Sequence, residues 1–138
     1  MSNSLIFATT TSAASVLQNG VLPLVNISRR RGCACSLGSN SILLNAPGYY
    51  KITGTVTFTA PVAGTITIQA QKNGVAVPGI TASTTITTAN TEVRSLAVSG
   101  VVRVFCNEGI ASLTLVNTGL AINLSNVSLD VEYLGWTI

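Results

Sequence analysis

The sequence of 138 residues contains no histidine, and only 8% of its residues are charged. Without histidine the chain lacks the usual general base and the commonest metal ligand. The acidic residues are also few: Glu92, Glu108, Asp130 and Glu132. So few titratable groups leave little from which an active site can be built. We therefore predict that the protein is not an enzyme and binds no cofactor or metal.

Asp130 and Glu132 are two residues apart, so on an extended strand their side chains share one face. A pair of carboxylates can hydrolyse glycosides or bind calcium. Neither residue lies in a glycine-rich or aromatic loop of the kind that forms such a site. We expect two solvated charges on an exposed strand face.

The net charge of +3 comes mostly from one run, Arg29, Arg30 and Arg31. An average soluble domain is roughly 25% charged, so here Thr, Ser and Asn must cover most of the surface. Nucleic-acid binding needs a basic stripe with aromatic stacking platforms. The remaining cations are isolated and aromatic residues make up 5% of the chain, so we expect no nucleic-acid binding.

Long apolar runs are missing despite a mean hydropathy of +0.55. No window contains the eighteen or so consecutive apolar residues that a membrane-spanning helix needs, so we expect no membrane insertion. The first ten residues have no Lys or Arg before a short apolar run that Thr interrupts, which makes a poor secretory signal. The protein is expected to be made in the cytoplasm and to stay there or leave within a larger particle.

The chain does have strict alternation of apolar and polar residues over short stretches. In residues 49–60 the alternation predicts a half-buried strand whose inward side chains are Tyr50, Ile52, Val56 and Phe58. Gly54 falls in the same register and predicts a bulge or the close approach of a neighbour. Asn73-Gly74 then predicts a hairpin between residues 65–71 and residues 75–81. Pro78 makes the second of these an edge strand.

Further strands are expected over residues 84–88, 92–105, 110–117 and 120–133. The alternation changes near Ser99-Gly100 and near Ser125-Asn126, which predicts an irregularity in both strands. Upstream the pattern is looser, with short strands expected over residues 5–9, 21–24, 32–37 and 41–45. Eight to ten short strands separated by turns predict an all-β sandwich or barrel. No linker or repeat interrupts the pattern, so we expect a single domain over residues 1–138.

The segment Gly48-Tyr-Tyr-Lys-Ile52, with the later Lys72-Asn-Gly74 turn and Val75-Ala-Val-Pro-Gly79, resembles the middle of C1q and tumour-necrosis-factor-like (TNF-like) jelly rolls. With Arg29-Arg-Arg-Gly-Cys33-Ala-Cys35 and Val102-Arg-Val-Phe-Cys106, the chain also resembles short structural proteins of phages and prophages of Gram-positive bacteria. The heads of spore-surface collagen-like glycoproteins are similar, but no Gly-X-Y stalk precedes this domain. The resemblance implies an antiparallel jelly-roll sandwich of about ten strands that forms a homotrimer, with one sheet of each subunit around a threefold axis.

The three cysteines allow several interpretations. Cys33 and Cys35 are expected on one face of a strand, and Cys106 at a strand end. Buried free thiols are favoured over a disulfide that involves Cys106, because free cysteine packs as a small apolar residue in a reducing cell. Three thiolates alone would leave a zinc site incomplete.

Two features are candidates for partner binding. Three adjacent arginines on a strand must alternate faces, so one of Arg29, Arg30 and Arg31 points away from the other two. They form either a solvated loop or an anchor for an acidic neighbour such as another virion subunit. Trp136 is either a core cap or an exposed docking residue.

These observations favour a virion accessory protein, a trimer that decorates the capsid or another phage surface. The alternative is a receptor-binding head that recognises host-surface carbohydrate at the tip of the jelly roll. Such a head needs a shaft, whereas here the strand pattern begins within the first ten residues. The sequence also offers no evident aromatic platform for a sugar.

Overall fold

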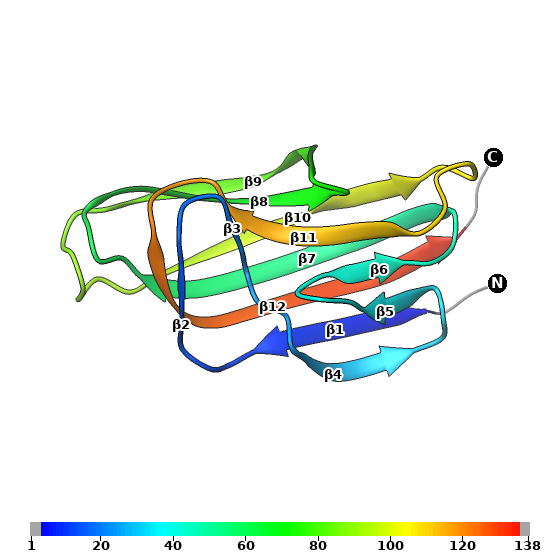
Figure 1. Ribbon diagram of the computed structural model, residues 1–138, viewed down its shortest axis with the longest axis horizontal. Helices are drawn as coiled ribbons and strands as arrows, with labels where there is room; N and C mark the ends of the chain where they lie inside the picture. Colours follow the sequence, from blue (N-terminus) through cyan, green and yellow to red (C-terminus); the bar gives the residue numbers. More distant parts are fainter. Residues whose placement is uncertain (1–3, 136–138) are drawn as a thin grey trace.

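The computed structural model describes residues 4–135, which form twelve strands and no helix (Figure 1). None of these residues therefore forms a helix that is long and apolar enough to cross a membrane. The strands pair in antiparallel fashion in two six-stranded sheets. Sheet A has the order β10 (Arg94–Val104), β7 (Gly48–Thr59), β12 (Ile122–Gly135), β1 (Leu5–Thr10) and β4 (Asn26–Arg31), with β2 (Ala14–Val16) also on β12. Sheet B has the order β5 (Cys35–Leu37), β6 (Ile42–Leu44), β11 (Ala111–Asn117), β8 (Gly64–Lys72) and β9 (Val75–Ile86), with β3 (Gly20–Val21) also on β11.

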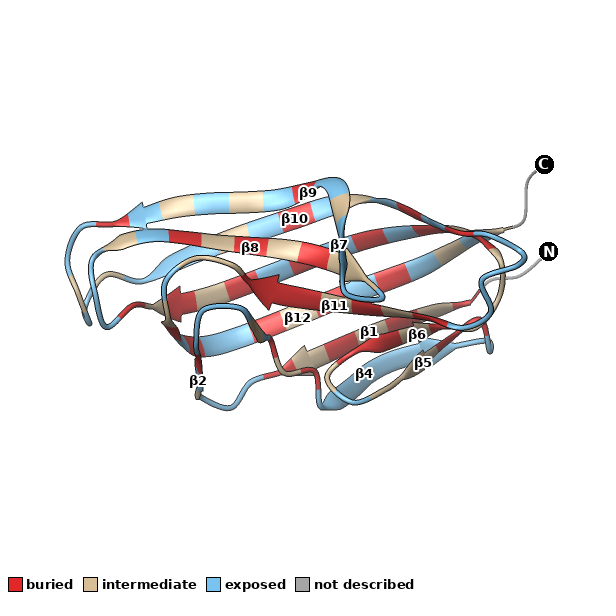
Figure 2. Ribbon diagram, turned by 45° about the horizontal axis from the view of Figure 1, so that its top comes forward, coloured by how far each residue is buried: buried red, intermediate tan, exposed pale blue. Residues whose placement is uncertain are grey.

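The core lies between the two sheets, because each long strand buries alternate side chains (Figure 2). In β7 the buried positions include Tyr50 and Phe58, which are fully inaccessible, as the alternation predicted. Tyr133 of β12 is half-buried, and its ring centroid lies 4.9 Å from that of Tyr50. The Tyr50 hydroxyl donates to the carbonyl oxygen of Ala46 at 2.5 Å, and the Tyr133 hydroxyl donates to that of Pro47 at 2.6 Å. Both rings therefore fix the turn that leads into β7.

Gly54 marks a close approach and not a bulge. The ladders from β7 to its two neighbours run through this residue without a shift, opposite Val98 and Leu129. A Cβ atom at Gly54 would lie 3.2–3.3 Å from the side chains of Val98, Leu115 and Leu129. Glycine at this position therefore leaves room for Leu115 of sheet B to pack against sheet A.

The predicted hairpin is confirmed. Asn73 and Gly74 connect β8 to β9 with φ values of 53° and 80°, the left-handed conformations that a tight hairpin turn requires. The Asn73 N–H donates to the carbonyl oxygen of Ser112, and the Ser112 N–H donates to Asn73 Oδ1, both at 2.8 Å. The turn is thereby tied to β11 as well as to its own strands.

Two details of the predicted strands are wrong. Residues 75–81 and 84–88 are not separate strands, because β9 runs without a break along the edge of sheet B. The alternation changes within β9 because its pairing with β8 shifts register between Gln69 and Gln71 of β8. Ser99-Gly100 is regular, since β10 pairs with β7 residue by residue throughout. Gly100 instead makes room for Ile80, whose side chain would lie 2.7 Å from an added Cβ atom. The irregularity expected near Ser125-Asn126 is confirmed as a register shift.

The N-terminal third differs most from the prediction. The strand expected over residues 32–37 is only β5, because Gly32 (φ 76°) turns the chain after β4. Residues 21–24 contribute only Val21 to β3, while β2 and β4 were not predicted. None of the six side chains of β4 is buried, so this strand carries no alternation that would reveal it.

Candidate interaction surface

The outer face of sheet A is the side that faces away from sheet B. The register places its side chains in rows that cross β4, β1, β12, β7 and β10. One row contains Arg31, Leu5, Glu132, Lys51 and Val101, and the next contains Arg29, Phe7, Asp130, Thr53 and Ser99. Residues directly opposite each other in adjacent strands share a face, so these ten side chains lie together on the outer face.

The other half of the outer face is lined by hydroxyl groups that bond to one another. Thr55 Oγ1 lies 2.7 Å from Ser128 Oγ, and Thr57 Oγ1 lies 3.0 Å from Ser95 Oγ. At the edge, Thr9 Oγ1 lies 3.0 Å from Ser28 Oγ. Burying a polar group is expensive mainly when it is left without a partner. This half of the face can therefore be covered by another protein at little energetic cost.

The charged half of the outer face has three parallel stripes. Arg29 and Arg31 form a basic stripe on β4, and Asp130 and Glu132 form an acidic stripe on β12. Leu5 and Phe7 of β1 lie between them and are half-buried. Both carboxylates are exposed, as expected.

Asp130 is partly desolvated by its neighbours, which raises its pKa above the ordinary value, and the nearby Glu132 carboxylate raises this pKa further. Among residues 4–135 the ion pairs are Lys72–Glu108 and Arg94–Glu92, so neither stripe is engaged in one.

The arginines lie on β4, an edge strand of sheet A, and do not form a loop. Arg30 is opposite Ile6, which faces the core, so it points to the other side of the sheet from Arg29 and Arg31. This confirms that one of the three points away from the other two. Arg29 Nη1 donates to the carbonyl oxygen of Ser28 at 2.8 Å. Trp136, the fourth predicted partner-binding residue, lies outside the described residues.

All three cysteines are free. Cys35 is buried in β5, and this burial raises its pKa to about 12, so it is an unreactive thiol. The expected burial was wrong for Cys33 and Cys106, which are exposed. Cys33 lies in the bend of residues 32–34 that precedes β5, and Cys106 lies in the turn after β10. Within residues 4–135 no three Cys, Asp or Glu side chains come together as a metal site would require.

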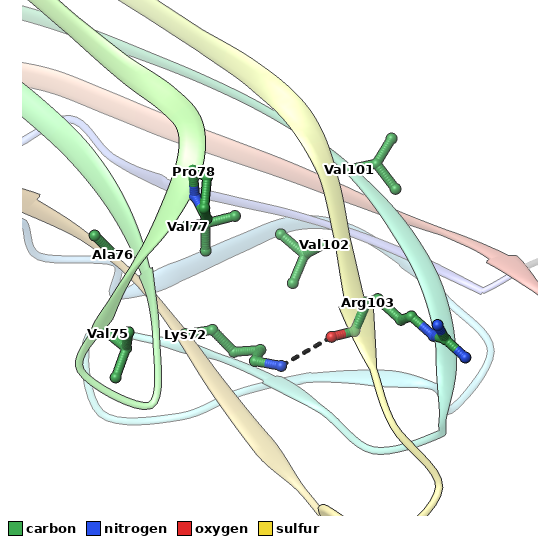
Figure 3. A pocket seen from close by; sticks show the side chains of 8 residues that line it. All are labelled: Lys72, Val75, Ala76, Val77, Pro78, Val101, Val102 and Arg103. Carbon is green, nitrogen blue, oxygen red and sulfur yellow. Dashed lines mark hydrogen bonds between the residues drawn. The ribbon is translucent and has the colours of Figure 1, made fainter.

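A small pocket of about 210 Å³ lies between the β8–β9 hairpin and β10 (Figure 3). Its wall is mostly apolar, from Val75, Ala76, Val77, Pro78 and Val102. The Lys72 ammonium closes one side and donates to the carbonyl oxygen of Arg103 at 2.9 Å.

The Arg103 guanidinium lies away from this pocket, 4.4 Å from the ring centroid of Phe105 and 5.3 Å from that of Tyr49. Phe105 is 48% exposed, an aromatic surface that alternation did not identify because the residue follows the end of β10.

No protein-family model matches the sequence, and no curated protein matches it. Solved structures do match the fold. Murine APRIL at pH 5.0 aligns with a TM-score of 0.72 and 14% identity, over 96% of this chain and 100% of that chain. The globular domain of zebrafish complement 1qA protein aligns with a TM-score of 0.62 and 9% identity, over 97% of this chain and 99% of that chain. The fold is a jelly roll of the TNF and C1q type.

The same jelly roll also occurs in PRD1 vertex protein P5, which aligns with a TM-score of 0.62 and 14% identity, over 96% of this chain and 97% of that chain. At these identities the likeness concerns the fold. The fold class predicted from alternation and from the C1q/TNF resemblance is therefore confirmed, with twelve strands in place of about ten.

Proposed function

We propose that this protein is a non-enzymatic structural or accessory subunit of a phage virion, a homotrimer that decorates the capsid or another particle surface. The observation that carries the proposal is the outer face of sheet A. It spans five strands, and in its uncharged half the hydroxyl groups are already bonded to one another. Such a face is easier to bury between subunits than a densely charged one, which would lose its hydration.

One of the similar solved structures supports a structural role in a virus particle. PRD1 vertex protein P5 has this fold, and its name assigns it a position at a vertex. No family model and no curated protein reproduces the resemblance of the blocks around Arg29 and Cys106 to short phage structural proteins, so the fold and the outer face carry the proposal. The C1q/TNF-like resemblance implies threefold assembly.

The proposed partner-binding residues are the arginines of β4 and Trp136. Arginine side chains can hold carboxylates through two parallel hydrogen bonds, which gives direction as well as attraction. The three arginines are exposed at a sheet edge and lie outside both ion pairs described above. An acidic protein surface, on the particle or on another copy of this chain, is therefore the partner that fits them.

Co-sedimentation tests the proposal. Tagged protein is mixed with particles that lack it, and pelleting is measured with particles present and absent. Retention on particles, reduced by high salt, is the expected result, because exposed ion pairs are screened. A protein that never pellets with particles, or that is monomeric, would contradict the proposal.

A second candidate is a receptor-binding head for host-surface carbohydrate, favoured by the pocket between the hairpin and β10. The exposed ring of Phe105 and the apolar wall of the pocket are surfaces on which a sugar can pack. Against this, the Arg103 guanidinium already lies over the Phe105 ring. Binding to host-cell envelopes that Phe105→Ala abolishes would favour the head, and binding unaffected by this change would remove the Phe105 ring from consideration.

A further inference from the structure

We propose that the two charged stripes of the outer face are the two halves of one contact between copies of this chain. Arg29 and Arg31 of one subunit pair with Asp130 and Glu132 of a second copy. This inference rests on the proposed self-assembly and names the residues that direct it.

Within one subunit the two stripes are held apart. β1 lies between β4 and β12 in sheet A, as Figure 1 shows. Neighbouring strands are about 4.8 Å apart, so the basic and acidic stripes are separated by roughly 10 Å. The half-buried side chains of Leu5 and Phe7 fill the intervening positions. Opposite charges therefore share a face in each subunit without forming an ion pair.

The spacing of the charges matches on the two strands. Arg29 and Arg31 are two residues apart on β4, and Asp130 and Glu132 are two residues apart on β12. Two residues of an extended strand span about 6.7 Å in either case. A second copy that brings its acidic stripe against the basic stripe can therefore form both pairs at once.

A ring of subunits satisfies this geometry repeatedly. In a head-to-tail contact, one subunit presents its basic stripe and the next presents its acidic stripe, so every stripe in a closed ring is matched. The apolar stripe of Leu5 and Phe7 adjoins both charged stripes and is covered by the same contact.

A second copy fits better than a foreign acidic protein because the acidic partner is already present in this chain at the required spacing. Two of its four acids are Asp130 and Glu132, on the same face as the arginines. Arg30 lies on the other face and is free to contact another protein.

Charge reversal tests the inference on the full chain. One variant carries R29E and R31E, a second carries D130R and E132R, and a third carries all four changes. Association is measured by light scattering under reducing conditions, because Cys33 and Cys106 are exposed. Circular dichroism checks that each variant is folded. Each double variant should raise the dissociation constant by roughly tenfold or more per lost pair, and the quadruple variant should recover much of the wild-type association.

R30E, compared with R31E, is the matched control, since it makes the same charge change on the same strand but on the opposite face. R31E should weaken association and R30E should not. Mixing the two double variants provides a second measurement that does not depend on folding of the quadruple variant. Their unlike stripes should pair and give complexes that contain both variants.

The outcomes distinguish failure of the proposed self-assembly from failure of the proposed charge pairing. If the wild-type protein is monomeric, the proposed self-assembly fails and this inference fails with it. If the wild-type protein assembles but the reversals have no effect, or if neither the quadruple variant nor the mixture recovers association, only the pairing is overturned. If R29E/R31E self-assembles normally but no longer pellets with particles, the arginines contact a foreign partner and the pairing is again overturned.

Discussion

Phe7 lies directly opposite Asp130 on the outer face of sheet A, between that carboxylate and the arginine stripe of β4. A ring in this position contributes little to the core, which lies on the other side of the sheet. It instead keeps the acidic and basic stripes apart and offers an apolar surface to whatever covers them.

Phe7→Ala should therefore weaken self-association more than it weakens the fold. Removing the half-buried ring takes apolar area from the contact between copies, and truncating an aromatic side chain near the centre of an interface costs about 2 kcal/mol or more. The dissociation constant from analytical ultracentrifugation should rise at least roughly tenfold. A variant that associates as the wild type does would place the contact elsewhere.

Alanine substitutions of one buried and one exposed phenylalanine test the position of the core. Phe58 is fully buried between the sheets and Phe105 is 48% exposed. Phe58→Ala should reduce the free energy of unfolding by about 3–5 kcal/mol, because it leaves a cavity in a packed core. Phe105→Ala should reduce it by less than about 1 kcal/mol, the worth of an exposed cation–π contact. Equal losses of unfolding free energy in urea denaturation of the two variants would show that the inward and outward faces of the strands are misassigned.

Two glycines should respond differently to alanine. A Cβ atom at Gly119 would lie 2.6 Å from the backbone nitrogen of Thr67 and 2.8 Å from the carbonyl oxygen of Thr65, neither of which can rotate away. At Gly54 the nearest atoms are side-chain methyl groups at 3.2–3.3 Å. Gly119→Ala should destabilise the protein by about 1–3 kcal/mol, and Gly54→Ala by less. The reverse order in thermal unfolding would contradict this description of the packing.

Glu92 should make the stability of the protein decrease at acidic pH. Hydrogen bonds from the Thr87 hydroxyl, the Arg94 side chain and the Thr88 N–H lower the pKa of Glu92 to about 2. Because the folded pKa lies below the unfolded value of about 4.5, its contribution is present above pH 4.5 and is lost as the pH falls toward 2. E92Q, which does not titrate, should lose less stability than the wild type over that interval. Parallel pH profiles of the two proteins would count against the role of this carboxylate in the β9–β10 turn.

Much of the fold follows from local pattern. Alternation located β7, β8 and β12, and Asn73-Gly74 located the hairpin, because buried and exposed positions there differ at every residue. β4 was missed since all its side chains are exposed, and β9 was divided in two because its register shift interrupts the alternation.

The candidate surface was less accessible to sequence reasoning. Arg29 and Asp130 are about one hundred residues apart in the chain, and only the pairing of β4, β1 and β12 places them on one face. The sequence singled out both charged segments but could not show that Phe7 lies between them.

The most direct test of the account is the molar mass of the wild-type protein in solution, measured by light scattering at micromolar concentration in a reducing buffer of low salt. The account predicts a trimer, with three times the 14.2 kDa mass of one chain. It also predicts that the mass falls toward that of the monomer as salt is added, because the subunits are held in part by ion pairs. A mass of one chain at low salt, without any particle present, would contradict it.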